Sequence, residues 1–202
     1  MRLPNEAHTS QPWRIHELTR DFELEDVWAL PTPGGPDDFP RLVQELISSD
    51  PTRSSSLPTR ALWAIRSRVG GLLGWDSADA GFGSRVATLR SWLPVDLRGV
   101  SSGPEIDGLP FSPLYLTDNE FAAETANQTV HAVMHLGWVP DPTGGYRGQM
   151  AVLVKPNGQF GAAYMAAIKP FRHLIVYPMF IRSIGKTWQA DGRSTAEEDA
   201  ST

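Results

Sequence analysis

The distribution of apolar residues near the C-terminal end of the chain predicts a buried strand followed by a long helix. Residues 150–154 read Met-Ala-Val-Leu-Val and are bounded by turn-forming residues, a pattern typical of a buried strand. Asn157 and Gly158 then favour a tight turn, and residues 160–188 follow as the predicted helix. Its apolar side, at spacings of three and four, consists of Tyr164, Ile168, Phe171, Ile175 and Met179. We therefore expect a curved sheet that grips this helix, with space between the two.

Further strand patterns precede this pair, and short turns join them. Strands are predicted at residues 114–117, 120–126, 129–139 and 146–155. Consecutive strands that are joined by tight turns pair antiparallel, so these four are expected to form a meander. Alternation of apolar and polar residues over 13–17 predicts a first strand, which residues 27–30 either continue or follow as a separate short strand.

Two shorter helices are predicted between the first strand and the meander. An apolar stripe with helical spacing consists of Phe39, Leu42, Val43, Leu46 and Ile47. Residues 60–73 carry a second such stripe. The predicted fold class is α+β, with one domain over residues 13–190. Residues 1–12 are expected to form a flexible arm, and the polar residues 191–202 a disordered tail.

Composition and charge exclude several classes of function. The 202 residues are 41% hydrophobic and 20% charged, as in an ordinary globular protein. A net charge of -5 argues against nucleic acid as a partner, since nucleic acid requires a basic surface. The absence of cysteine excludes disulfides and cysteine metal sites. The N-terminus lacks the apolar region of a signal peptide, and no apolar run approaches the roughly 20 residues of a membrane span. We therefore expect a cytoplasmic protein without a membrane span.

Several segments of the chain resemble a known family. They are residues 28–35, Trp-Ala-Leu-Pro-Thr-Pro-Gly-Gly, together with residues 127–140, 144–158 and 164–178. These segments look like a bacterial, largely actinobacterial family of unknown function within the START-like (SRPBCC) helix-grip superfamily. The resemblance implies a curved antiparallel sheet wrapped around a long C-terminal helix, two shorter helices after the first strand, and a cavity. It does not imply an activity, because this fold carries many unrelated functions.

His131 and His135 are the most conspicuous candidates for chemistry. On a strand they lie on one face, about 13 Å apart at roughly 3.3 Å per residue, too far for both to bind one metal ion. No metal site is therefore expected. If their face lines the cavity, they supply two groups that titrate near neutral pH. The alternative is that they lie on the outer face of the sheet, bonded to neighbouring residues or to a dimer partner.

The leading functional hypothesis is a binding module that holds a small hydrophobic or aromatic ligand between the sheet and the C-terminal helix. The candidate ligand-binding residues are His131, Val133, His135, Met150, Val152, Tyr164, Ile168 and Phe171. No cofactor is expected, because the standard glycine-rich phosphate loops are absent. Glu120 and Glu124 share one strand face, but the sequence identifies no partner carboxylate for an acid pair.

Two alternatives remain open at this stage. The first is an enzyme of the cyclase or lyase type that acts on a carbonyl, polyketide-like substrate. In it His131 or His135 is the general base, and Tyr146 or Arg147 stabilises an enolate. The second is a structural protein that forms a homodimer through an apolar patch over the sheet.

Overall fold

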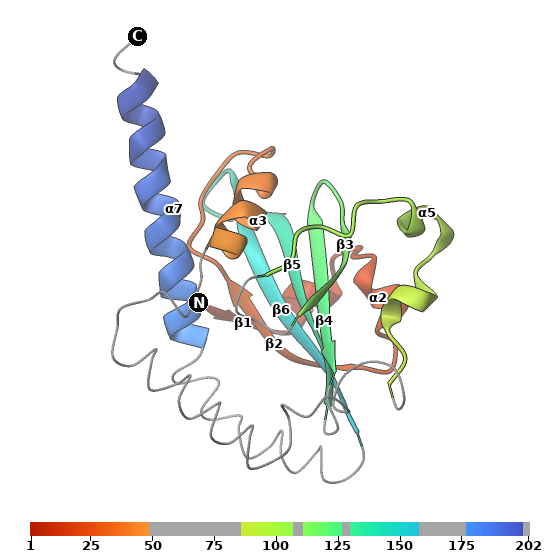
Figure 1. Cartoon of the computed structure of the whole chain (residues 1–202). Helices are drawn as coiled ribbons and strands as arrows, with labels where there is room; N and C mark the ends of the chain where they lie inside the picture. The colour runs from red at the N-terminus through yellow and green to blue at the C-terminus, as the bar shows by residue number, and fades with distance from the viewer. Residues whose placement is uncertain (49–85, 107–110, 127–129, 158–176, 200–202) are drawn as a thin grey trace, which may run out of the picture.

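A curved, six-stranded antiparallel sheet forms the centre of this α+β protein (Figure 1). The computed structural model describes residues 1–48, 86–106, 111–126, 130–157 and 177–199. The strands are β1 Arg2–Leu3, β2 Glu23–Ala29, β3 Ser112–Leu116, β4 Glu120–Ala126, β5 Val130–Pro140 and β6 Tyr146–Pro156, in the spatial order β1-β2-β6-β5-β4-β3. The described helices are α1 Glu6–Thr9, α2 Ile15–Leu18, α3 Phe39–Ser48, the 3-10 turn η1 Leu89–Trp92, α5 Val95–Arg98 and α7 Tyr177–Asp199.

The predicted meander is confirmed, since β3, β4, β5 and β6 are neighbours in both sequence and space. β5 and β6 form a long hairpin with Val130 opposite Pro156 and Pro140 opposite Tyr146. Its turn uses Gly144 and Gly145 with φ angles of 104° and 73°, which only glycine adopts readily. β2 pairs with the outer side of β6, so β6 lies inside the sheet and is hydrogen-bonded on both edges.

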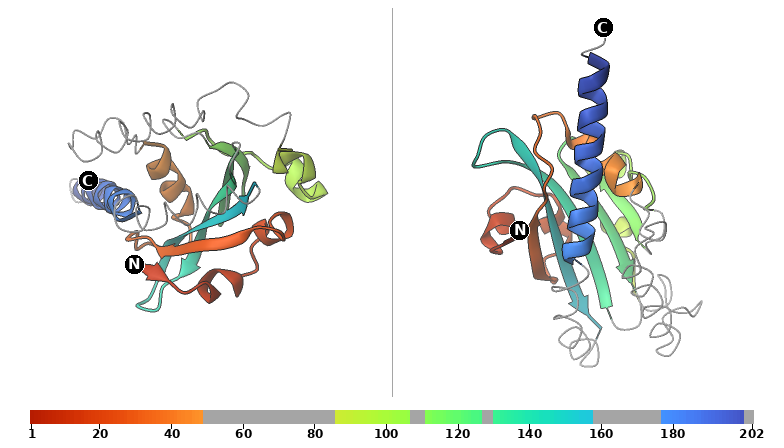
Figure 2. Two further views of the ribbon diagram at one scale, coloured as in Figure 1. Left: turned by 90° about the horizontal axis from the view of Figure 1, so that it is seen from below. Right: turned by 90° about the vertical axis from the view of Figure 1, so that its left-hand side faces the viewer.

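The two faces of the sheet are covered by different parts of the chain (Figure 2). On β5, Met134, Leu136 and Trp138 belong to the core cluster that also contains residues of α3 and α7. We call this side the α7 face. Val133, which precedes Met134 on β5, packs instead with residues of the N-terminal segment, η1 and α5. Because His131 and His135 share this second side with Val133, we call it the histidine face.

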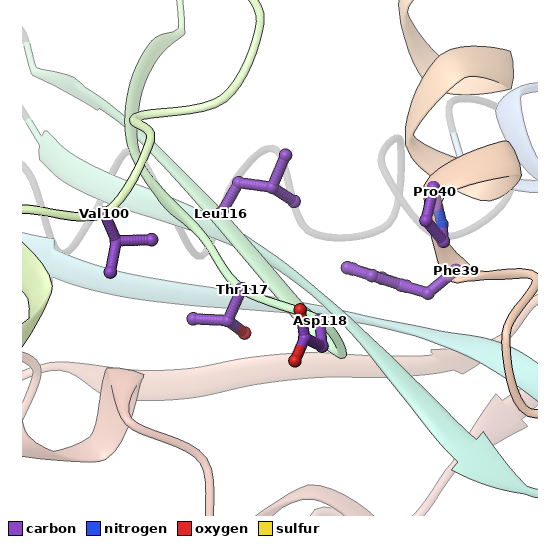
Figure 3. Close-up of a pocket in the computed structure, with 6 residues that line it drawn as sticks. All are labelled: Phe39, Pro40, Val100, Leu116, Thr117 and Asp118. Carbon is purple, nitrogen blue, oxygen red and sulfur yellow. The ribbon is translucent and has the colours of Figure 1, made fainter.

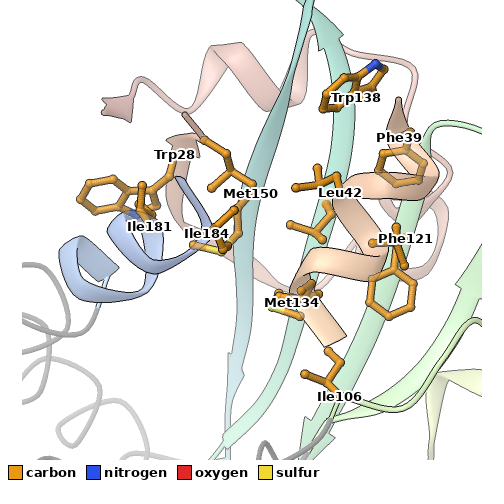
Figure 4. Packing of buried hydrophobic residues seen from close by; sticks show 14 of the residues in the cluster. Trp28, Phe39, Leu42, Ile106, Phe121, Met134, Trp138, Met150, Ile181 and Ile184 are labelled. Carbon is orange, nitrogen blue, oxygen red and sulfur yellow. The ribbon is translucent and has the colours of Figure 1, made fainter. Parts of the chain in front are cut away.

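The C-terminal helix is fastened to the α7 face by an apolar stripe at helical spacing (Figure 4). The stripe consists of Tyr177, Ile181, Ile184 and Trp188. Tyr177 packs on Trp28 of β2 with ring centroids 5.5 Å apart, and Trp188 on Trp138 of β5 at 6.0 Å. The predicted helix at Phe39 is confirmed as α3, whose buried stripe fills the space beside α7.

Both ends of the chain carry regular secondary structure. Residues 13–17 do not form a strand: His16 and Glu17 donate backbone hydrogen bonds to residues three positions earlier, at the start of the helical turn α2. Residues 1–12 are not a loose arm, because β1 pairs with β2 and α1 buries His8 completely. At the other end α7 continues to Asp199, where a disordered tail was expected from residue 191.

Several predicted features lie outside the described residues. These are the second helix at residues 60–73 and residues 160–176 of the predicted long helix, which include Tyr164, Ile168 and Phe171. In the part of the chain that is described, no helix is both long and apolar enough to cross a membrane.

Candidate functional site

The structure divides the predicted ligand-binding residues between the two faces of the sheet. Met150 and Val152 lie on the α7 face. His131, Val133 and His135 lie on the histidine face, and none of them points toward α7. His131 and His135 are both buried, beneath the N-terminal segment and η1. The five candidates that the structure describes therefore do not all face the C-terminal helix.

Glu120, at the start of β4, is a buried carboxylate surrounded by donors. The backbone N–H of Arg14 reaches both of its oxygens at 3.0 Å. Tyr115 donates its hydroxyl to the carboxylate at 3.0 Å, and Nε2 of His135 lies 3.2 Å away. Burial raises the pKa of Glu120, but the bonds from His135, Arg14 and Tyr115 outweigh it and hold the pKa below its ordinary value. Glu120 is therefore ionised at neutral pH.

A chain of three imidazoles extends from Glu120 to the surface of the protein. Nδ1 of His135 lies 3.1 Å from Nε2 of His8, and Nδ1 of His8 lies 3.1 Å from Nε2 of His16. His135 belongs to β5, His8 to α1 and His16 to α2, so residues far apart in sequence meet in one hydrogen-bonded line. His135 and His8 are fully buried, whereas His16 is partly exposed.

The carboxylate at one end fixes the proton positions along the whole chain. An ionised carboxylate only accepts, so Nε2 of His135 carries the proton. A neutral His135 then accepts at Nδ1 from Nε2–H of His8, and His8 in turn accepts at Nδ1 from Nε2–H of His16. All three imidazoles are satisfied as the same neutral tautomer, pointing in the same direction. A proton added at the exposed end could pass inward by successive transfers between neighbouring nitrogens.

Electrostatics in the chain favours the neutral imidazoles. The pKa of His8 is lowered to about 2, mainly by burial and in smaller part by the neighbouring His135 and His16. Burial also lowers the pKa of His135, against the raising effect of Glu120, and burial lowers the pKa of the more exposed His16. The pKa of Tyr115 is raised, first by burial and then by the charge of Glu120, so its hydroxyl stays protonated.

A second carboxylate and imidazole pair lies further along the same face. Nε2 of His131 is 2.7 Å from Oε2 of Glu124. Glu124 also accepts from the hydroxyl of Thr88 and from the backbone N–H of Leu89 at 3.1 Å, which fixes the start of η1. The ring of Phe22 packs edge-on against His131 at 5.0 Å. Since both members are buried and bonded to neighbouring elements, the pair holds the layers of the protein together.

These histidines do not form a metal centre. The two ring nitrogens of His8 face different imidazoles, so the nitrogens of the chain do not converge on one point. Throughout the described ranges, no group of three or more histidine and carboxylate side chains has the geometry to hold a metal ion.

Tyr146 and Arg147 lie far from both His131 and His135 along the hairpin. Arg147 lies opposite Val139 near the hairpin turn, and its Nε pairs with Asp141 at 3.0 Å. His135 lies opposite Ala151, four residues further along β6, or about 13 Å at roughly 3.3 Å per residue. The four residues of the predicted catalytic set are therefore not brought together.

An open apolar pocket lies at the edge of the α7 face (Figure 3). It lies between the first turn of α3 and the turn that joins β3 to β4, and its volume is about 460 Å³. Its lining consists of Phe39, Pro40, Val100, Leu116, Thr117 and Asp118. The lining is therefore mainly apolar, with one hydroxyl and one carboxylate.

Comparison with known proteins gives a family but no function. Residues 18–179 match the model of a family described as protein of unknown function, DUF2867. This chain belongs to the DUF2867 family. No curated protein and no solved structure matched the chain.

The boundary of the DUF2867 match divides the histidine chain. Glu120 and His135 lie inside the matched residues, as does the whole pocket. His8 and His16 precede residue 18 and lie outside the match. Glu120 and His135 thus belong to the matched DUF2867 residues, and His8 and His16 belong to the N-terminal segment packed on them.

Sequence reasoning missed His8, His16 and the lining of the pocket. For Glu120 and Glu124 a signal was available. Two carboxylates lie four residues apart on one strand, and two histidines lie four residues apart on the neighbouring strand. Nothing comparable existed for His8, whose burial depends on the tertiary position of α1. The pocket also brings together residues from three separate segments, which no local pattern records.

Proposed function

We propose that this DUF2867 protein is a START-like binding domain that holds a small apolar or aromatic molecule at the α3 edge of the α7 face. The observation that carries the proposal is the open pocket beside Phe39. Its volume of about 460 Å³ falls within the range of roughly 300–1,000 Å³ that is usual for small-molecule sites. An apolar wall with few polar groups is the lining typical of such sites.

The chemistry of the lining indicates the class of ligand. Val100 and Leu116 offer apolar contact, and Phe39, which is only 1% exposed, adds an apolar boundary beside them. Thr117 and Asp118 also line the pocket, and their side-chain oxygens can accept a hydrogen bond from a hydroxyl or amine of the ligand. A compact aromatic alcohol fits this arrangement better than an anion does, because Asp118 would repel a negative charge.

Binding can be tested with 1-naphthol and decanoic acid as probes. Trp138 lies 6.4 Å from Phe39, centroid to centroid, so an aromatic ligand held in the pocket should quench tryptophan fluorescence. A ligand that binds only the folded state also raises the melting temperature. We expect 1-naphthol to bind with micromolar to submillimolar affinity and decanoic acid to bind more weakly.

Two exposed valines in one segment supply a matched pair of variants. Val100 lines the pocket and is 38% exposed, whereas Val95 on α5 is 80% exposed and outside the pocket. Val100→Asp places a second carboxylate in the apolar wall and should weaken 1-naphthol binding at least tenfold. Val95→Asp should leave the affinity unchanged. Equal affinities in the two variants would rule out the proposed site. So would the absence, up to 1 mM, of both quenching by 1-naphthol and a thermal shift with either probe.

A further inference from the structure

The N-terminal segment is docked on the histidine face by contacts that depend on uncharged imidazoles. The His8 ring is inserted between His135 and His16, edge-on to both, with ring centroids 5.0 and 4.9 Å away. The Trp13 indole covers Gly137, where a Cβ atom would lie only 2.6 Å from the ring. The amide of Gln149 donates to the carbonyl of Ala7 at 3.1 Å. α1 and α2 therefore close over the chain of imidazoles and bury it.

We propose that Glu120, His135, His8 and His16 form an acid-operated latch, which holds α1 and α2 on the sheet while its imidazoles are neutral and releases them when the imidazoles take up protons. The latch consists of these four residues only. It joins the sheet, through Glu120 and His135, to the segment that precedes the DUF2867 match, through His8 and His16.

The charged groups around the latch can compensate only one added proton. Glu120 contributes one negative charge, and Tyr115 is neutral. The guanidinium of Arg14 is already paired with Asp96 at 2.6 Å and with Glu17 at 2.8 Å. The carboxylate of Glu120 can therefore balance one added proton. A second proton would place two adjacent imidazolium ions in a buried site, which is strongly unfavourable.

The sign of the pH effect follows from the pKa values. His8 and His135 have a lowered pKa in the closed form, whereas an exposed imidazole titrates near 6.5. The open form thus binds more protons below pH 6.5, so the closed form is fully favoured above that pH and loses stability as the pH falls. Each buried imidazole raises the equilibrium constant for opening about tenfold for every pH unit below 6.5. Between pH 7.5 and 5.0 the two buried imidazoles together raise the equilibrium constant for opening by up to roughly a thousandfold.

The latch can open without unfolding the sheet, because its two halves are held differently. α1 and α2 are four residues each and have few internal hydrogen bonds. β5 and β6 are paired along their full length and covered on both faces. Short, weakly bonded segments open at a lower free energy than core strands do.

Hydrogen exchange of the full chain at pH 7.5 and 5.0, corrected for the intrinsic effect of pH, tests the latch. We expect amides of residues 5–19, including the Arg14 N–H bound to Glu120, to lose protection at least thirtyfold at pH 5.0. Amides of β5 and β6 should keep theirs. In His8→Gln the side chain still donates and accepts but does not titrate, so the loss of protection should shrink at least tenfold. His131→Gln, on the same strand face but outside the latch, should retain the wild-type response.

Three results would overturn the proposal. The first is unchanged protection of residues 5–19 at the two pH values, and the second is an equal response in wild type and His8→Gln. The third is a loss of protection in β5 and β6 together with residues 5–19, which would mean global unfolding. If His8→Gln does not fold, side-chain ¹⁵N spectra of the wild type decide instead. His8 and His135 should stay neutral in the closed form, and their titration near pH 6.5 without loss of protection would equally exclude the latch.

Discussion

Trp188→Ala is expected to lower the free energy of unfolding by about 3–5 kcal/mol, the usual cost of removing a buried aromatic side chain. Trp188 is only 4% exposed. Its indole packs on Trp138, lies under the guanidinium of Arg41 at 3.9 Å, and donates Nε1–H to the carbonyl of Pro33 at 3.0 Å. These three interactions fasten α7 to the sheet, to α3 and to the loop before α3, and alanine removes all of them. Urea unfolding followed by circular dichroism measures the loss.

Trp92→Ala is the matched control for this prediction. Trp92 is 70% exposed on η1, and substitutions at such surface positions usually change stability by about 0.5 kcal/mol or less. If Trp188→Ala were as mild as Trp92→Ala, α7 would not be a stable part of the core. The α7 face would then lie open in solution, and the pocket at its edge would lose its support.

The local elements of this fold were predictable from the sequence because they depend on short-range patterns. The helical stripe from Phe39 to Leu46 and the turn residues around Gly144 each act over a few positions. The strands of the meander followed with errors of one or two residues at their ends. The alternation in residues 13–17 predicted a strand where the structure has a helical turn. Five residues are too few to distinguish the two patterns, and the turn is stabilised by tertiary contacts such as that of Arg14 with Glu120.

Part of the candidate site was also available from the sequence. A two-residue turn at positions 127 and 128 would set Glu124 opposite His131 and Glu120 opposite His135. The observed register differs by two residues and places Glu120 opposite Gly137, so each carboxylate meets its histidine diagonally. A shift of two residues preserves the face of every side chain, and diagonal neighbours remain within reach of long side chains. The pairing of the two carboxylates with the two histidines was therefore predictable.

The face on which these pairs lie was not predictable, and it decides the functional interpretation. Both faces of β5 are apolar enough to be buried, so the pattern could not show which one meets α7. The structure buries His131 and His135 under the N-terminal segment and leaves Met134, Leu136 and Trp138 toward α7. The histidines consequently connect the sheet to the N-terminal segment, while the apolar pocket lies on the other side of the sheet.

Glu120→Ala is expected to have an effect as large as that of Trp188→Ala, for an electrostatic reason. The variant leaves the Arg14 N–H, the Tyr115 hydroxyl and Nε2–H of His135 without their acceptor in a buried site. Breaking a buried hydrogen-bonded charge network of this kind costs about 3–5 kcal/mol. Urea unfolding at pH 7.5 should show this loss, because at that pH His135, His8 and His16 are all neutral in the wild type.

Two further variants separate the network from simple charge removal. Glu17→Ala removes an exposed carboxylate that pairs with Arg14, and it should be nearly neutral because exposed ion pairs contribute little. Glu120→Gln keeps an acceptor oxygen for Arg14 but turns an N–H toward the donors of Tyr115 or His135, so its cost should lie between the other two. Equal stability of Glu120→Ala and Glu17→Ala would mean that the carboxylate does not organise the imidazoles. The fixed tautomers along His135, His8 and His16 would then lose their physical cause.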